Sequence, residues 1–211
     1  MSARFDKERD KANLARLDRT RQIAVAAAAL DRMRVGYAIW APTAGGRASI
    51  EDLLRYVWEF VVDSKPPPPM QEVERLYPST DGPATLESPY AESFLEAFQL
   101  FADFALSNHD GRLVEIRQAA YNMAFDAAGD ATLKYNAPGY DGLINPEREQ
   151  RILAHPWVSR ELDNQSLDVR DAAMDGEVSH VTARLRERAD ATPVVSYSEL
   201  EAIRAFQARR A

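Results

Sequence analysis

The residues best suited to chemistry in this chain are three histidines and scattered carboxylates, and they form no recognisable catalytic set. The histidines are His109, His155 and His180, and cysteine is absent, which excludes a thiolate nucleophile and a zinc–thiolate site. The G-x-S-x-G, H-E-x-x-H and glycine-rich phosphate-binding patterns are absent too. The sequence therefore predicts no catalytic residue, no cofactor and no metal. It favours a protein that is not an enzyme but leaves that question open.

One fragment of a metal-binding pattern is present. Glu177 and His180 form an E-x-x-H spacing, which on a helix directs a carboxylate and an imidazole to the same side. Helical di-iron proteins need two such motifs and two further glutamates, and the other two histidines have Leu106 and Ile152 at the corresponding position. A solvated helix face is therefore the better interpretation of this fragment.

A second candidate group combines a cation with two polar residues of one helix. Glu161 and Gln165 are four residues apart and share a helix face, so they form either a hydrogen-bonded pair at a helix interface or a ligand-binding pair. Together with Arg32 they are candidate polar anchors of a pocket behind an aromatic helix at residues 90–104. The aromatic side chains of that helix are predicted mainly to form the core.

The elements that must position these residues are predicted to be helices throughout. Alanine, the strongest helix former, occurs 34 times, and apolar residues recur at three- and four-residue spacings along most of the chain. No convincing strand pattern is present. We expect an all-α, single-domain helical bundle of about six to nine helices, with residues 1–196 as the domain and residues 197–211 as a helical extension packed on it.

Several helix ends can be predicted from capping residues. Helices are expected to start after a polar cap, in three cases with a following proline, at Ser49, Ser88, Asn145 and His155. Ser198 with Glu201 predicts a capping box for the last helix. Gly129 is expected to end a helix before an irregular stretch at residues 130–143.

The charge balance limits the classes of partner. The chain has 26 basic and 33 acidic residues, for a formal charge of −7, which argues against binding to nucleic acid or to an anionic membrane. No apolar segment is long enough to cross a bilayer, and the charged N-terminus does not read as a signal peptide. We therefore expect a cytoplasmic protein whose partners are neither nucleic acid nor membrane.

An ordered series of short spacings runs from about Leu14 to about Ser196. It comprises Leu14-x-x-Leu17, Arg21-Gln22-Ile23-Ala24, Asp31-Arg32-Met33, Tyr37, the helix from Ile50 to Val61 with Trp58, Pro78-Ser79-Thr80-Asp81, and His155-Pro156-x-Val158-x-x-Glu161-x-x-x-Gln165. This series resembles the YjaG-like family of bacterial proteins of unknown function, although that family's usual ending is not matched here. The resemblance implies an all-helical cytoplasmic fold and no known reaction. Tyr37 and Trp58, which lie in the matched series, join Arg32, Glu161 and Gln165 as candidate ligand or interface residues.

Three functions remain as hypotheses. The leading one is a non-catalytic acidic protein that binds a basic protein partner, either as an immunity-type inhibitor of a toxin or as an adaptor. The second is a small-ligand-binding protein or enzyme with a pocket behind residues 90–104. The third is a homo-oligomeric scaffold, in which the C-terminal extension docks onto a neighbouring subunit.

Overall fold

The protein is an all-α domain, as the sequence predicts. The computed structural model describes residues 4–40, 49–65, 73–74, 76, 85–107, 109–133 and 145–209, and within these ranges it contains ten α-helices and no strand. The helices are α1 (Lys7–Leu14), α2 (Arg19–Arg32), α3 (Arg34–Trp40), α4 (Ile50–Asp63), α6 (Ser88–Ser107), α7 (Gly111–Thr132), α8 (Pro146–Leu153), α9 (Pro156–Ala172), α10 (Val178–Ala191) and α11 (Tyr197–Ala208). This is one helix more than the upper expectation, because the N-terminal stretch forms three helices.

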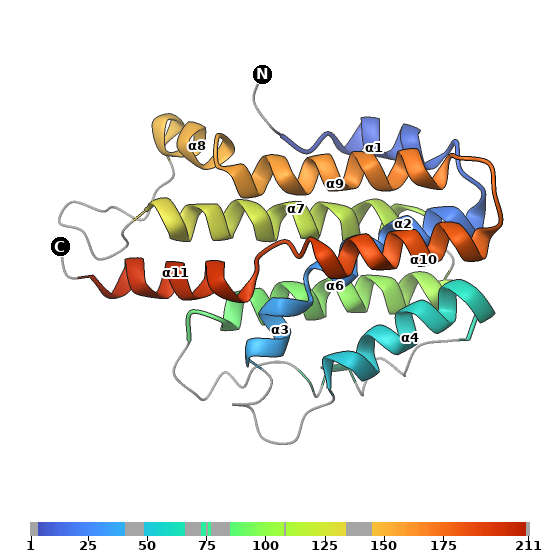
Figure 1. The fold of residues 1–211 in the computed structure, drawn as a ribbon, viewed down its shortest axis with the longest axis horizontal. Helices are drawn as coiled ribbons and strands as arrows, with labels where there is room; N and C mark the ends of the chain where they lie inside the picture. Colours follow the sequence, from blue (N-terminus) through green and yellow to red (C-terminus); the bar gives the residue numbers. More distant parts are fainter. Residues whose placement is uncertain are drawn as a thin grey trace.

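Two helices organise the packing. The long helix α7 packs against α6 on one side and α9 on the other, and it also contacts α1, α2, α8 and α11. Figure 1 shows α9, α7 and α6 running side by side along the length of the molecule. Helix α2 packs against α7, α9, α10 and α4. It therefore contacts helices from both the N-terminal and the C-terminal parts of the sequence. Of the described helices, none combines the length and apolarity needed to span a bilayer.

The central position of α2 follows from its small side chains. Residues 24–30 have no exposed surface, and six of these seven residues are alanine or valine. Side chains this small let neighbouring helix backbones approach closely on several sides. Because residues 24–30 are buried on all sides, this part of α2 has no solvent-exposed side and shows no amphipathic pattern.

Local capping residues set several helix starts as expected. The side chain of Ser49 accepts a hydrogen bond from the backbone N–H of Asp52, and Asn145 and His155 cap α8 and α9 in the same manner. Three predictions were wrong. Ser88 is the first residue of α6 and not the cap before it. Helix α7 continues past Gly129 to Thr132, and the capping box of α11 pairs Ser196 with Glu199, two residues before the predicted pair.

The aromatic face of α6 lies in the core. Tyr90, Phe94, Phe98, Phe101 and Phe104 are all buried, in agreement with the core interpretation. Residues 134–143 of the expected irregular stretch lie outside the described residues.

The C-terminal segment packs on the domain through its last helix. Gln207 of α11 donates hydrogen bonds to the backbone oxygens of Asp130 and Leu133. Arg160 of α9 forms an ion pair with Glu199.

Helices α3 and α6 approach each other at a glycine. A Cβ atom added to Gly36 would lie 2.6 Å from the Cβ of Tyr90 and 3.1 Å from its backbone carbonyl. Backbone atoms cannot be displaced cheaply, so this position requires glycine despite its low helix propensity.

Gly36→Ala is expected to lower the free energy of unfolding by about 1–3 kcal/mol, because overpacking outweighs the gain in helix propensity. Gly111→Ala is the matched control, because the Cβ added there meets only the movable ring of His109, and it should leave stability unchanged or slightly higher. Urea unfolding followed by circular dichroism measures both. Equal stability of the two variants would contradict the close helix contact.

Candidate functional site

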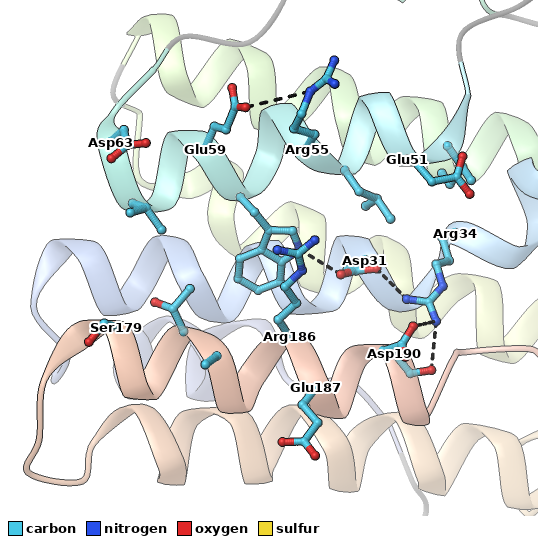
Figure 2. A pocket seen from close by; sticks show the side chains of 16 residues that line it. Asp31, Arg34, Glu51, Arg55, Glu59, Asp63, Ser179, Arg186, Glu187 and Asp190 are labelled. Atoms are coloured by element: carbon cyan, nitrogen blue, oxygen red, sulfur yellow. Dashed lines mark hydrogen bonds and ion pairs between the residues drawn. The ribbon is translucent and has the colours of Figure 1, made fainter.

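A groove of about 1040 Å³ lies between α4 and α10. Both helices pack against α2, and the C-terminal end of α2 with the start of α3 forms the floor between them (Figure 2). We call this feature the α4–α10 groove. Its walls carry five apolar or aromatic side chains, Ile50, Leu54, Trp58, Val62 and Ala183.

A buried carboxylate lies at the floor of the α4–α10 groove. The indole Nε1 of Trp58 donates to Asp31 Oδ2 at 2.8 Å, and Arg34 Nη1 donates to Oδ1 at 3.0 Å. The side chain of Asp31 is only 4% exposed. Burial raises the pKa of Asp31 above its ordinary value, and the hydrogen bonds from Trp58 and Arg34 oppose that rise only in part.

Arg34 also connects the floor to the end of α10. Its Nη2 donates to the backbone oxygen of Asp190 at 2.9 Å and to the Asp190 carboxylate at 2.5 Å. Figure 2 shows the chain of contacts from Asp31 through Arg34 to Asp190 at one end of the α4–α10 groove. These bonds hold α10 at a set position over the end of α2.

The guanidinium of Arg186 has spare binding capacity in the α4–α10 groove. It lies 6.0 Å from the centre of the Trp58 ring, at the outer limit of a cation–π contact, and forms no ion pair with another described residue. The hydroxyl of Thr182 has no hydrogen-bond partner among the described residues either, but that oxygen is buried and is not exposed to the groove.

The rim of the α4–α10 groove is acidic. Six acidic and three basic residues line the groove, for a formal charge of −3. Arg34 forms ion pairs with Asp31 and Asp190. Arg55 forms ion pairs with Asp52 and Glu59.

Three of the lining carboxylates, Glu51, Asp63 and Glu187, have no ion-pair partner among the described residues. They are the charges most available to a cationic partner.

A second polar cluster lies inside the bundle. Arg32, which is fully buried, donates to both carboxylate oxygens of Glu161 at 2.9 and 3.0 Å and to Asp168 at 2.6 Å. Burial by itself would lower the pKa of Arg32, but the charges of Asp168 and Glu161 raise it above its ordinary value. The guanidinium therefore stays charged, and α2 is tied to α9 by three charge-assisted bonds.

The buried cluster extends to three more helices. Gln165 donates to Glu161 and to the backbone oxygen of Arg117, both at 2.8 Å. Arg117 of α7 forms a bidentate pair with Asp10 of α1. Arg188 of α10 donates to Asp168 at 2.8 Å and also contacts Asp171. The buried charges thus join α1, α2, α7, α9 and α10.

The five residues singled out from the sequence do not form one site. The structure brings Arg32, Glu161 and Gln165 together, but they bond to one another and to protein groups, and none lines the α4–α10 groove. Trp58 does line it. Tyr37 is buried, with its ring centre 5.4 Å from that of Phe94.

The groove lies away from the expected pocket behind residues 90–104. Its lining comes from α2, α3, α4 and α10, with no described residue of α6.

Sequence reasoning missed Asp31 and Thr182 as residues that line the groove. Asp31 and Arg34 are three residues apart and both charged, which is a weak signal for a helix pair. No local pattern indicates that Thr182 and Trp58 line the same groove, because 124 positions of the sequence separate them. As for metal ligands, no group of three or more histidine or acidic residues in the described part of the chain is placed to hold an ion.

The comparisons with known proteins find one similar fold. A DUF416 family protein from Shewanella baltica OS155 superposes with a TM-score of 0.68 at 15% identity, covering 90% of this chain and 95% of that one. No protein-family model and no curated protein matches the chain. At this identity the likeness shows a shared fold alone. The YjaG-like resemblance therefore stays a prediction.

The Arg32 cluster is expected to carry much of the stability. Arg32→Met leaves Glu161 and Asp168 without their shared cation, and breaking a buried pair from one side costs about 3–5 kcal/mol. Arg151→Met removes a cation from an exposed pair with Glu147, and it should change stability by no more than about 0.5 kcal/mol. Urea unfolding at neutral pH compares them, and similar midpoints would refute a structural role for the cluster.

The floor carboxylate predicts a pH-dependent effect. Because the pKa of Asp31 is raised in the folded protein, its ionised form disfavours folding, so Asp31→Asn should raise the thermal midpoint at pH 7. The gain should vanish below about pH 3.8, the ordinary Asp pKa, where the wild-type carboxyl is protonated in both the folded and unfolded states. Asp163→Asn, at an exposed position, is the control. A gain from Asp31→Asn that persists at low pH would be against the prediction.

Proposed function

We propose that this protein is a non-catalytic binding protein whose α4–α10 groove receives a basic protein partner. The observation that carries the proposal is the combination of apolar walls with a negatively charged rim in one groove. Protein interfaces commonly have an apolar centre surrounded by polar residues. The groove is large and has Val62, which is 67% exposed, at its edge, so it offers an apolar surface that a partner would cover.

Charge supports the choice of a basic partner. The groove has a formal charge of −3 from its lining residues, and the whole chain carries −7. Complementary charge accelerates association and selects the partner more than it adds to the final affinity. Nucleic acid and anionic membranes are disfavoured as partners by the same negative field.

A more specific form of the proposal is an immunity-type inhibitor or an adaptor. In the first case the acidic rim would cover a basic site of a toxin, and in the second it would hold a basic segment of another protein. Membership of the YjaG-like family and a cytoplasmic location belong to this proposal as well. A second candidate is binding of a small ligand, which the unpaired guanidinium of Arg186 and the volume of the groove support.

The test is affinity capture with matched charge variants. The tagged wild-type protein, Glu51→Lys/Asp63→Lys and the control Glu92→Lys/Asp163→Lys are incubated with native lysate at low and high salt. Both double variants change the net charge equally, but only the first changes the α4–α10 groove. We expect one stoichiometric basic protein, identified by mass spectrometry, that the wild type and control retain at low salt and the groove variant loses.

Other outcomes count against the proposal. A partner that the groove variant retains as well as the wild type would place the interface elsewhere. Absence of any co-purifying protein, together with stabilisation of the wild type by a small molecule in a thermal-shift screen, would favour the ligand-binding candidate. A change in mass in solution that depends on residues 197–211 would favour the homo-oligomeric scaffold.

A further inference from the structure

We infer that the partner segment that fills the α4–α10 groove is an amphipathic α-helix with basic residues near both of its ends. This inference rests on the proposed function and adds the shape and charge pattern of the bound segment. The observations that carry it are the length of the groove, its apolar side chains and the charges at its two ends.

The lining residues show that the groove runs the full length of both helices. On α4 they recur in adjacent pairs every four positions, at residues 50–51, 54–55, 58–59 and 62–63, and on α10 they are residues 179, 182, 183, 186, 187 and 190. At a rise of 1.5 Å per residue, residues 50 to 63 span about 20 Å. A rod of three to four helical turns matches this length, whereas a compact small molecule would occupy only part of it.

The two ends of the α4–α10 groove are both negative. Figure 2 shows Glu51 at the end near Arg34 and Asp63 at the opposite end near Ser179. Their separation along α4 is 12 residues, or about 18 Å. Neither carboxylate has an ion-pair partner among the described residues, so each is available to a basic side chain of the occupant.

The end at Asp63 carries an additional negative potential. Asp63 is the last residue of α4, and the last turn of that helix contains no basic residue. The carbonyl end of a helix carries a partial negative charge, so Asp63 and the helix end repel each other. Lys65 is nearby in sequence, but its ammonium pairs with Glu59 at 2.6 Å. A lysine or arginine of the partner would relieve this repulsion.

The middle of the α4–α10 groove supplies apolar contact. Leu54, Trp58 and Val62 follow one another at four-residue spacing on α4, which suits apolar residues at i, i+3, i+4 and i+7 of a bound helix. A helix satisfies its own backbone hydrogen bonds, and the described residues of the groove form no sheet edge to which an extended peptide could add as a strand.

The test uses a displayed library of random peptides of about 16 residues, which span about 24 Å as a helix. Selection against the wild-type protein should enrich sequences with an apolar residue every three or four positions and Lys or Arg about 11–12 residues apart. Synthetic copies should become helical on binding, as measured by circular dichroism. Glu51→Lys/Asp63→Lys should weaken their binding by about tenfold or more, whereas Glu92→Lys/Asp163→Lys should not.

Several results would overturn the inference. Enriched peptides that are acidic, rich in proline or extended when bound would exclude a basic helix, and so would a failure to enrich any sequence. Equal binding to the groove variant and the control would also exclude it. If lysate capture still identifies a partner that depends on Glu51 and Asp63, the proposed function stands and only the helical occupant is wrong.

Discussion

The pairing of Arg32 with two carboxylates is the constraint on which the rest of the structure depends. A fully buried guanidinium is tolerated only when anions surround it, and Glu161 and Asp168 meet this need from α9. Asp168 is shared with Arg188 of α10, so one carboxylate holds three helices together. The backbone oxygen of Arg32 also accepts a hydrogen bond from the N–H of Val194, after α10. These bonds position α9, α10 and the segment that follows α10 around the C-terminal end of α2.

The residue next to Arg32 on α2 lies at the floor of the α4–α10 groove. Asp31 and Arg32 are neighbours on α2, and successive helix residues point about 100° apart. Arg32 faces α9, whereas Asp31 lies at the floor of the groove and accepts hydrogen bonds from Trp58 and Arg34. The same turn of helix thus anchors the core on one side and positions a polar floor on the other. Because α4 and α10 both rest on α2, the space between them persists as a groove.

Charge pairing distinguishes the α4–α10 groove from the buried cluster. The charged groups of the buried cluster pair with one another, whereas Arg186 and three rim carboxylates of the groove have no ion-pair partner among the described residues. A groove with apolar walls and unpaired charges at its ends would be able to select a partner by shape and charge. This contrast supports the proposed binding role of the groove and a stabilising role of the buried cluster.

The sequence by itself determined the fold class and many helix starts, because both depend on local features. Helical spacing and alanine content predict the all-α domain, and Ser49, Asn145 and His155 cap helices through hydrogen bonds to residues two or three positions away. The sequence pattern placed the capping box of α11 two residues too late. Ser196 and Ser198 each precede a glutamate by three positions, and the local pattern does not distinguish these two pairs. The contact of Arg32 with Asp168 joins residues 136 positions apart, and the groove joins α4 to α10. Tertiary structure alone decided these, since residue types and local spacing carry no information about which distant helices pack together.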